Sequence, residues 1–207
     1  MKRRGLTAPL RGLYAITPER VERATLRRQV AQALEGGIAM LQYRHKGAQD
    51  VDEARELAQL CRRSGVPFIV NDDLALALAC GADGVHLGRE DGDLAAARTK
   101  LGDKLLGVSC YDSLAAARAA VAAGADYVAF GSVFASPTKP GAVRAPLSLF
   151  AQARLLGVPL VAIGGITLEN APQLLAAGAD GLAVISDLFD APDIAGRARA
   201  YGKLFRP

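Results

Sequence analysis

Three short segments of this 207-residue chain place charged side chains directly after apolar runs that are typical of buried strands. The first segment contains Arg44 and Lys46, the second Asn71 and Asp72, and the third Lys139. Lys and Arg neutralise phosphate oxygens, while Asp carboxylates hold the Mg²⁺ that bridges such oxygens. Because the three segments end successive strands, we expect one site for a diphosphate and its metal ion.

Taken alone, each segment also has a plainer interpretation. Arg44 and Lys46 are two residues apart, so both can point to one side of an extended chain or simply form a solvated strand exit. Asn71 or Asp73 could cap a helix, although Asn71-Asp72-Asp73 exceeds what one cap needs. A metal or substrate role for one of the three is therefore expected.

A fourth apolar run is followed by Asp91, which could be a second metal ligand, a loop acid or a helix cap. Mg²⁺ commonly takes one or two carboxylates together with substrate phosphate and water, and Asp72 with Asp91 fits that number. His86 lies inside this run, and we expect it to be buried and hydrogen-bonded. The chain has only two His and offers no His/Cys cluster for zinc. A Ser-His-Asp nucleophile is therefore not expected, and Ser109 is interpreted as a hydrogen-bonding contact.

Two later segments complete the candidate site. Gly165 follows the seventh run, and Ile185 and Ser186 end the eighth. Backbone N–H groups after strands seven and eight often bind phosphate in (βα)8 barrels, so a second, uncharged anion station is expected here. Residues 135–145 contain two prolines beside Lys139 and form either a lid over the substrate or an ordinary exposed loop.

Eight apolar runs alternate with Ala- and Leu-rich segments of helical length, such as 48–63 and 113–123. The runs are Leu13–Thr17, Met40–Arg44, Pro67–Asn71, Gly84–Gly88, Leu105–Cys110, Tyr127–Phe134, Pro159–Gly164 and Gly181–Ser186. Gly-Ala-Asp recurs at 81–83, 124–126 and 178–180, between a helix and the next strand. This pattern predicts an α/β fold, a (βα)8 TIM barrel in one compact domain. An open doubly wound sheet of six units is the alternative, and both folds place the site at the carboxyl ends of the strands.

The charge distribution bears on partners. The net charge is +4, but Lys2, Arg3, Arg4 and Arg11 lie in the first 11 residues; without these four, 21 Lys and Arg remain against 21 Asp and Glu. We interpret residues 1–12 as a solvated basic tail and 13–207 as the barrel, in preference to an RNA-binding arm. No run approaches the ~20 apolar residues of a membrane span, and the start lacks a secretory pattern. Three well-separated Cys suggest reduced thiols and a cytoplasmic protein.

The motifs together resemble the thiamine phosphate synthase (thiamine-phosphate pyrophosphorylase) family over most of the chain. The matching motifs are Gln-x-Arg-x-Lys at 42–46, Asn-Asp at 71–72, His-Leu-Gly-x-x-Asp at 86–91, Thr-Lys at 138–139, Ile-Gly-Gly-Ile at 163–166 with Asn170, and Gly-Ala-Asp-Gly at 178–181 leading into Val-Ile-Ser. The resemblance implies a homodimeric (βα)8 transferase of thiamine biosynthesis. Such an enzyme uses Mg²⁺ to join hydroxymethylpyrimidine diphosphate to a thiazole phosphate, giving thiamine phosphate and diphosphate.

The same resemblance assigns roles to single residues. The diphosphate would be held by four side chains, which are Arg44, Lys46, Asn71 and Lys139. Mg²⁺ would be held by Asp72 and Asp91. Gln42 and Ser109 would face the pyrimidine and the departing group, and Ser136 and Thr138 would also bind substrate. Backbone at Gly165, Ile185 and Ser186 would hold the thiazole phosphate, and the catalytic residues would be Lys139, Arg44 and Ser109.

The chain also departs from the family pattern. Ser136 stands where Thr is usual, Ser132 stands where Pro is common, and residues 141–144 are atypical. The sequence is also compatible with two other functions. One is the related thiazole tautomerase, which usually lacks the full diphosphate-binding set that is present here. The other is a non-catalytic protein that binds thiamine precursors.

Overall fold

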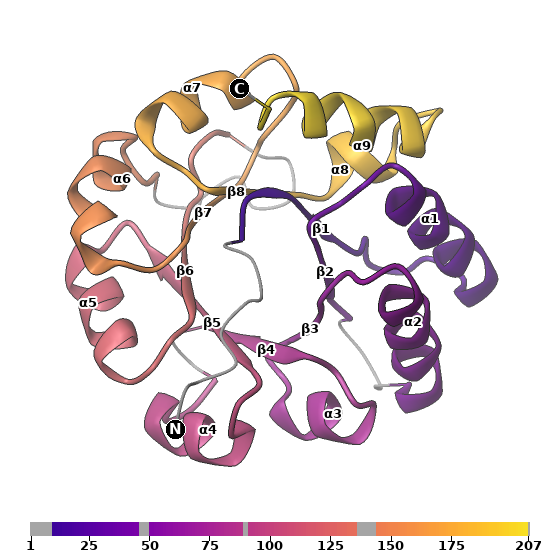
Figure 1. The fold of residues 1–207 in the computed structure, drawn as a ribbon, viewed down its shortest axis with the longest axis horizontal. Coiled ribbons are helices and arrows are strands. Elements are labelled where there is room, and N and C mark those ends of the chain that lie inside the picture. Colours follow the sequence, from indigo (N-terminus) through magenta and orange to yellow (C-terminus); the bar gives the residue numbers. More distant parts are fainter. Residues whose placement is uncertain (1–9, 46–49, 89–90, 136–143, 207) are drawn as a thin grey trace.

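Eight parallel strands close into one barrel, as the sequence predicts, and this excludes the open six-unit sheet (Figure 1). The computed structural model describes residues 10–45, 50–88, 91–135 and 144–206. The strands are β1 Gly12–Ile16, β2 Met40–Tyr43, β3 Phe68–Asn71, β4 Gly84–Leu87, β5 Leu105–Tyr111, β6 Tyr127–Phe130, β7 Leu160–Ile163 and β8 Gly181–Val184. Pairing of β1 with β8, with Leu13 beside Leu182, closes the ring.

Helices surround this ring and cover the outer face of the sheet (Figure 1). They are α1 Arg23–Glu35, α2 Val51–Arg63, α3 Leu74–Ala79, α4 Leu94–Leu101, α5 Leu114–Ala122, α6 Ser148–Ala153 with the 3₁₀ turn Arg154–Leu156, α7 Ala171–Ala177, α8 Ser186–Phe189 and α9 Ile194–Lys203. Side chains of Asp50 and Ser113 cap α2 and α5, which agree with the predicted helices. In the part of the chain that the structure describes, no helix is long and apolar enough to cross a membrane.

The sixth strand is shorter than predicted. It ends at Phe130, and the following Gly131–Ser132 peptide bond is cis. The amides of Val133 and Phe134 do not continue the ladder but donate to the carbonyls of Ile163 and Gly164. The prediction extended the strand to Phe134 because the sequence stays apolar up to that residue. Val133 is indeed buried, but it lies outside the strand.

Two layers of apolar side chains make the core. The larger layer lies between the strands and the helices, and a smaller one fills the barrel interior. Because both faces of each strand are buried, the strands appear in sequence as continuous apolar runs. The interior layer contains Tyr14 and Tyr127, two large polar aromatics among aliphatic neighbours. The three cysteines are free, which agrees with the reduced thiols expected from the sequence, and all three are buried.

The recurring Gly-Ala-Asp motif is a structural clamp at the amino ends of the strands. Asp83, Asp126 and Asp180 each accept a hydrogen bond from the first or second backbone amide of the preceding strand. The donors are the amides of Phe68, Leu106 and Leu160, at 2.8–2.9 Å. The backbone amide of each Asp also donates to the carbonyl of that same residue. The motif therefore fixes the register between neighbouring strands. It lies at the amino ends of the strands, away from their carboxyl ends.

Asp180→Ala is expected to lower the free energy of unfolding by about 1–2 kcal/mol, because the Leu160 amide loses its acceptor. Urea denaturation of both proteins measures this difference. Asp103→Ala, at an exposed turn position, is the matched control and should stay within about 0.5 kcal/mol of the wild type. Equal stability of the two variants would contradict the clamp.

Candidate functional site at the carboxyl ends of the strands

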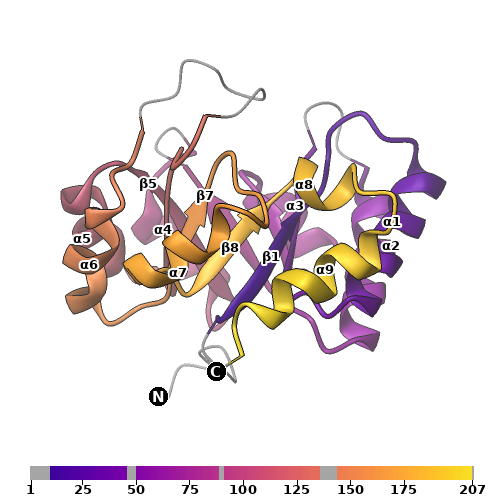
Figure 2. The same ribbon diagram turned by 90° about the horizontal axis from the view of Figure 1, so that it is seen from above.

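The polar residues singled out in the sequence gather at one end of the barrel. Figure 2 shows the start of β1 beside the end of α9 at one end, and α8, which directly follows β8, toward the opposite end. The carboxyl ends of all eight parallel strands lie at that opposite end. Side chains at the ends of β2, β3 and β5 and in the following loops can therefore act on one ligand.

Asp72 is the centre of the acidic part of this site. Its carboxyl interacts with the Asp91 carboxyl and the Asn71 side chain, and the charge of Arg44 also acts on it. Asp72 is exposed as a whole residue, but partial desolvation of its carboxyl, followed by the interaction with Asp91, raises its pKa above the ordinary range. Three residues at or after the ends of three different strands, Arg44, Asn71 and Asp91, thus act on the carboxyl group of Asp72.

The backbone holds Asp72 in an uncommon conformation. Its φ is +61°, and the Asp73 amide donates to the Asn71 carbonyl at 2.8 Å, which makes a tight γ-turn after β3. Asp73 then caps α3 by accepting from the Leu76 amide at 2.7 Å, as one interpretation of this segment proposed. The turn therefore separates two roles: Asp73 starts the helix, and Asp72 is left to face Asp91.

The Asp91 carboxylate is anchored by its own loop. Its Oδ2 accepts from the Gly88 amide at 2.5 Å. A Cβ at position 88 would lie 3.0 Å from that oxygen, so a side chain larger than Gly would press on the carboxylate. Among the residues described, no group of three or more His, Cys, Asp and Glu side chains is arranged to hold a metal ion. The Asp72–Asp91 pair is thus suited to a cation that takes its other ligands from substrate and water.

Arg44 lies just after β2 and forms an ion pair with Glu19, a residue that sequence reasoning did not select. The Arg44 side chain is 15% exposed, and that of Glu19 is 26% exposed. The buried Thr17 hydroxyl accepts from the Arg44 amide at 2.8 Å and fixes the backbone at this point. Arg44 therefore has a set position, and its guanidinium is shared with a carboxylate.

A continuous path of hydrogen bonds crosses the barrel interior between Gln42 and Ser109. Gln42 Nε2 donates to Tyr14 Oη at 2.8 Å, and Tyr14 Oη lies 2.7 Å from Tyr127 Oη. Tyr127 Oη lies 3.1 Å from His86 Nδ1, and His86 Nε2 lies 2.9 Å from Ser109 Oγ. His86 is buried and hydrogen-bonded, as predicted, and burial lowers its pKa to about 4. Burial raises the pKa of both tyrosines, so all five groups are neutral at pH 7.

Sequence reasoning missed Tyr14 and Tyr127 because each lies within an apolar strand. A signal was nonetheless present. A buried Tyr hydroxyl requires a hydrogen-bond partner, and the barrel interior offers few. Tyr14 aligns with Met40 on β2 and with Ala183 on β8. These apolar side chains can pack against its ring but cannot bond its hydroxyl. The polar ends of Gln42 and His86 supply the missing partners.

The turn after β7 has no room for side chains. Gly164 and Gly165 have φ values of +103° and +63°, and a Cβ at Gly165 would lie 2.3 Å from the Ala135 carbonyl oxygen. Asn170 stabilises the turn, because its Nδ2 donates to the Gly165 carbonyl and its Oδ1 accepts from the Thr167 amide, both at 2.9 Å. The Gly-Gly motif is thus required by close backbone packing.

Ile185 and Ser186 follow β8 and begin the short helix α8. The next residue, Asp187, accepts hydrogen bonds from Arg197 at 3.2 and 3.3 Å and from the Tyr201 hydroxyl at 2.7 Å. Both donors lie on α9, so the long helix fixes the position of the short one. Sequence reasoning found Ser186 but missed these supports, which lie 10 and 14 residues beyond Asp187.

Four of the predicted site residues lie outside the described residues; these are Lys46, Ser136, Thr138 and Lys139. Their assignments, like the substrate contacts of the other site residues, stay predictions. Arg144, which ends the same loop region, is described and is exposed.

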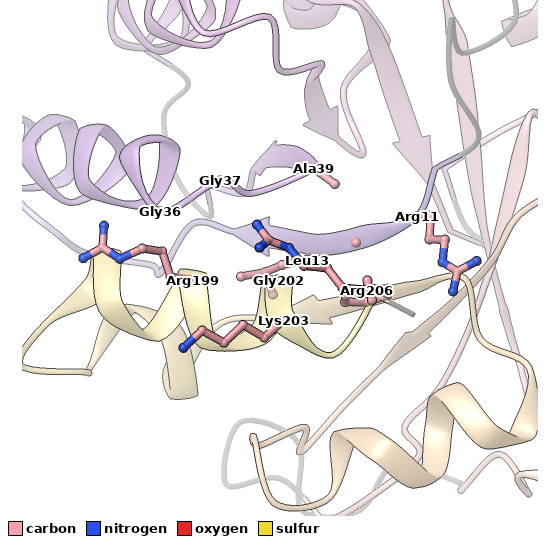
Figure 3. A pocket seen from close by; sticks show the side chains of 11 residues that line it. Arg11, Leu13, Gly36, Gly37, Ala39, Arg199, Gly202, Lys203 and Arg206 are labelled. Atoms are coloured by element: carbon pink, nitrogen blue, oxygen red, sulfur yellow. The ribbon is translucent and has the colours of Figure 1, made fainter.

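A separate cavity of about 340 Å³ lies at the amino ends of the strands, lined by Arg11, Arg199, Lys203, Arg206 and neighbouring backbone (Figure 3). All four cations are exposed. Figure 3 shows Arg199 and Lys203 extending away from α9 in different directions, so these charges do not converge on one point. The carboxyl-end cluster therefore remains the candidate active site.

Comparisons with known proteins agree with this geometry. Residues 13–188 match the family described as thiamine monophosphate synthase. The thiamine-phosphate synthase of Aromatoleum aromaticum is 62% identical over 201 residues, covering 95% of this chain and 97% of that protein. That of an Azoarcus species is 60% identical, with coverage of 95% and 98%. A solved thiamine phosphate pyrophosphorylase from Pyrococcus furiosus superposes with a TM-score of 0.83 at 35% identity, covering 94% of this chain and 95% of that one.

Proposed function

The chain belongs to the thiamine monophosphate synthase family, and from that premise we propose that it joins hydroxymethylpyrimidine diphosphate to a thiazole phosphate, releasing diphosphate. The product is thiamine phosphate, and the enzyme is a transferase. One observation carries the proposal at the level of residues: Asn71, Asp91 and Arg44 all act on the Asp72 carboxyl group at the carboxyl ends of the strands. A diphosphate with a divalent cation is the ligand whose charges suit that set.

We infer that Asp72 and Asp91 hold Mg²⁺. Two neighbouring carboxyl groups that interact, one of them with a raised pKa, gain from a cation placed between them. When bound, Mg²⁺ would neutralise charge that develops on the departing diphosphate. Arg44 and Asn71, together with Lys46 and Lys139, are assigned to the same diphosphate.

The proposed reaction is dissociative: the bond between the pyrimidine methylene carbon and the diphosphate oxygen breaks first, and the thiazole nitrogen then attacks the carbocation. Such a step needs stabilisation of the leaving group and correct positioning, not a protein nucleophile. The site fits this requirement. Ser109 contacts His86, but the other ring nitrogen of His86 contacts a tyrosine hydroxyl, so no carboxylate orients the pair as in a hydrolase triad.

A coupling assay tests the function directly. Purified protein is mixed with the pyrimidine diphosphate, the thiazole phosphate and Mg²⁺, and thiamine phosphate is measured after oxidation to its fluorescent thiochrome derivative. We expect product that depends on all three components and disappears with EDTA. If folded protein gives no product while isomerisation of the thiazole phosphate is detected, the tautomerase interpretation replaces this one.

Gly165→Ala is expected to raise the KM for the thiazole phosphate at least about tenfold, because the new Cβ would collide with the Ala135 carbonyl and displace the turn assigned to that phosphate. Gly157→Ala is the matched control, since Gly157 also has a positive φ, of +70°, but open space around it. Both substitutions place an L side chain at a similar positive φ, +63° at Gly165 and +70° at Gly157. Steady-state kinetics with varied thiazole phosphate should separate them, and equal KM values would contradict the assignment.

Two coarser expectations complete the proposal. We propose that the enzyme works as a homodimer, as the family resemblance implies, and light scattering at micromolar concentration tests this. We also propose a cytoplasmic location, which is supported by three buried free thiols. Fractionation of cells that produce the protein tests the second point.

A further inference from the structure

The hydrogen-bond path from Gln42 to Ser109 has a direction that follows from counting protons. Gln42 Nε2 donates to Tyr14, so the single hydroxyl proton of Tyr14 is free to donate to Tyr127. The single hydroxyl proton of Tyr127 then points to His86 Nδ1. A neutral imidazole has one donor and one acceptor nitrogen. With Nδ1 accepting, the proton of His86 lies on Nε2 and is donated to Ser109 Oγ.

The two ends of this path are therefore different. At one end, the Gln42 amide uses its N–H on Tyr14 and keeps its carbonyl oxygen as an acceptor. At the other end, Ser109 accepts from His86 and keeps its own hydroxyl proton to donate. Gln42, Tyr14, Tyr127 and His86 are each at most 6% exposed. Reversing the direction would require the amide, two hydroxyls and the imidazole tautomer to change together inside the barrel.

We propose that Tyr14, Tyr127 and His86 orient the two groups that the family resemblance assigns to the pyrimidine, so that Gln42 Oε1 accepts from the exocyclic amino group and Ser109 donates to the substrate. The identity of the ligand rests on the proposed function, whereas the direction of the chain does not. Tyr14, Tyr127 and His86 are positioning residues, because each acts through its neighbour in the path. A pyrimidine that carries an oxo group in place of the amino group would set its oxygen against Gln42 Oε1 and be rejected.

The direction can be measured without substrate. The chain has only two His, so protein labelled with ¹⁵N-histidine gives two imidazole spin systems, and a His45→Gln variant assigns the remaining one to His86. At pH 7 we expect the ¹⁵N shifts of His86 to show a protonated Nε2 and an unprotonated Nδ1. In Tyr127→Phe, which removes the donor to Nδ1, the proton should redistribute between the two nitrogens. Protonation of Nδ1 in the wild type would overturn the proposal.

Selectivity is measured with the pyrimidine diphosphate and its 4-oxo analogue, each coupled to the thiazole phosphate. We expect the wild type to favour the amino compound at least about a hundredfold in kcat/KM. Tyr127→Phe should reduce this ratio at least about tenfold. Tyr43→Phe is the matched control, because it removes another buried hydroxyl, one that bonds Glu53 outside the barrel interior, and it should leave the ratio unchanged.

The two experiments separate the possible failures. If the protein couples the substrates but Nδ1 carries the proton, or if the 4-oxo analogue is accepted equally, the directed chain is wrong and the synthase stands. If the tautomer is as expected but no coupling occurs, the proposed function is wrong and the direction of the chain stands. A ratio that Tyr127→Phe and Tyr43→Phe lower equally would also overturn the positioning role of Tyr127.

Discussion

Asp72→Asn is expected to lower the rate of thiamine phosphate formation at least about a hundredfold while leaving the substrate-free protein at least as stable as the wild type. The activity should fall because Asn keeps the size of Asp but removes the charge assigned to Mg²⁺. The stability follows from the raised pKa of Asp72, which results first from partial desolvation of the carboxyl and then from the interaction with Asp91. The coupling assay and urea denaturation in EDTA provide the two measurements.

The sign of the stability effect follows from proton linkage. A carboxyl group whose pKa is raised on folding binds more protons in the folded protein than in the unfolded chain. Its contribution to stability is therefore complete below the unfolded pKa, near 4, and it is lost as the pH rises through the folded value. At pH 7, ionised Asp72 opposes folding of the metal-free protein. Asp72→Asn removes that cost, so the variant should gain or keep stability in EDTA and lose any stabilisation by Mg²⁺.

Asp73→Asn is the matched control for this prediction. Asp73 is the adjacent residue and caps α3 through the Leu76 amide, a role that Asn performs equally well. Its activity and its response to Mg²⁺ should stay close to the wild type. Should Asp72→Asn retain full activity at saturating Mg²⁺, the metal assignment would be wrong. If it lost activity and also became less stable in EDTA, the role of Asp72 would be structural.

The positions of the candidate site residues could largely be predicted because they depend on local sequence. Each apolar run ends where polar residues begin, and parallel strands of a barrel bring those ends together. Asn71, Asp72 and Asp91 were selected in this way, and the structure brings them into contact. The Asp73 cap was also predictable, since capping depends on a residue and the amide three positions later.

The supports of the site could not be predicted because their partners are distant in sequence. Tyr14 and Tyr127 are separated by 113 residues, and their contact depends on which face of β1 and β6 points into the barrel. The ladder between β5 and β6 shifts register after Ser109, and no periodicity in the sequence indicates that shift. Glu19 lies in the loop after β1, where its acidic side chain looked like one of many surface charges until its pairing with Arg44 was visible.

Arg44→Ala is expected to lower kcat/KM for the pyrimidine diphosphate at least about a hundredfold. Two effects add. The diphosphate loses a guanidinium, which binds phosphate oxygens in a bidentate manner. The Glu19 carboxylate, which Arg44 now neutralises, would in addition present its negative charge to the incoming anion. Coupling rates measured at varied diphosphate concentration, with the thiazole phosphate saturating, give the size of the loss.

Glu19→Gln separates these two effects. If Glu19 adds repulsion only when Arg44 is missing, the double variant Glu19→Gln with Arg44→Ala should recover at least about threefold of the lost kcat/KM. Arg44→Lys keeps the charge but not the planar fork, so its loss should be intermediate. An Arg44→Ala enzyme with wild-type kinetics would remove Arg44 from the diphosphate site. A double variant no better than Arg44→Ala would show that Glu19 acts only by holding Arg44 in place, because repulsion between Glu19 and the substrate would then be absent.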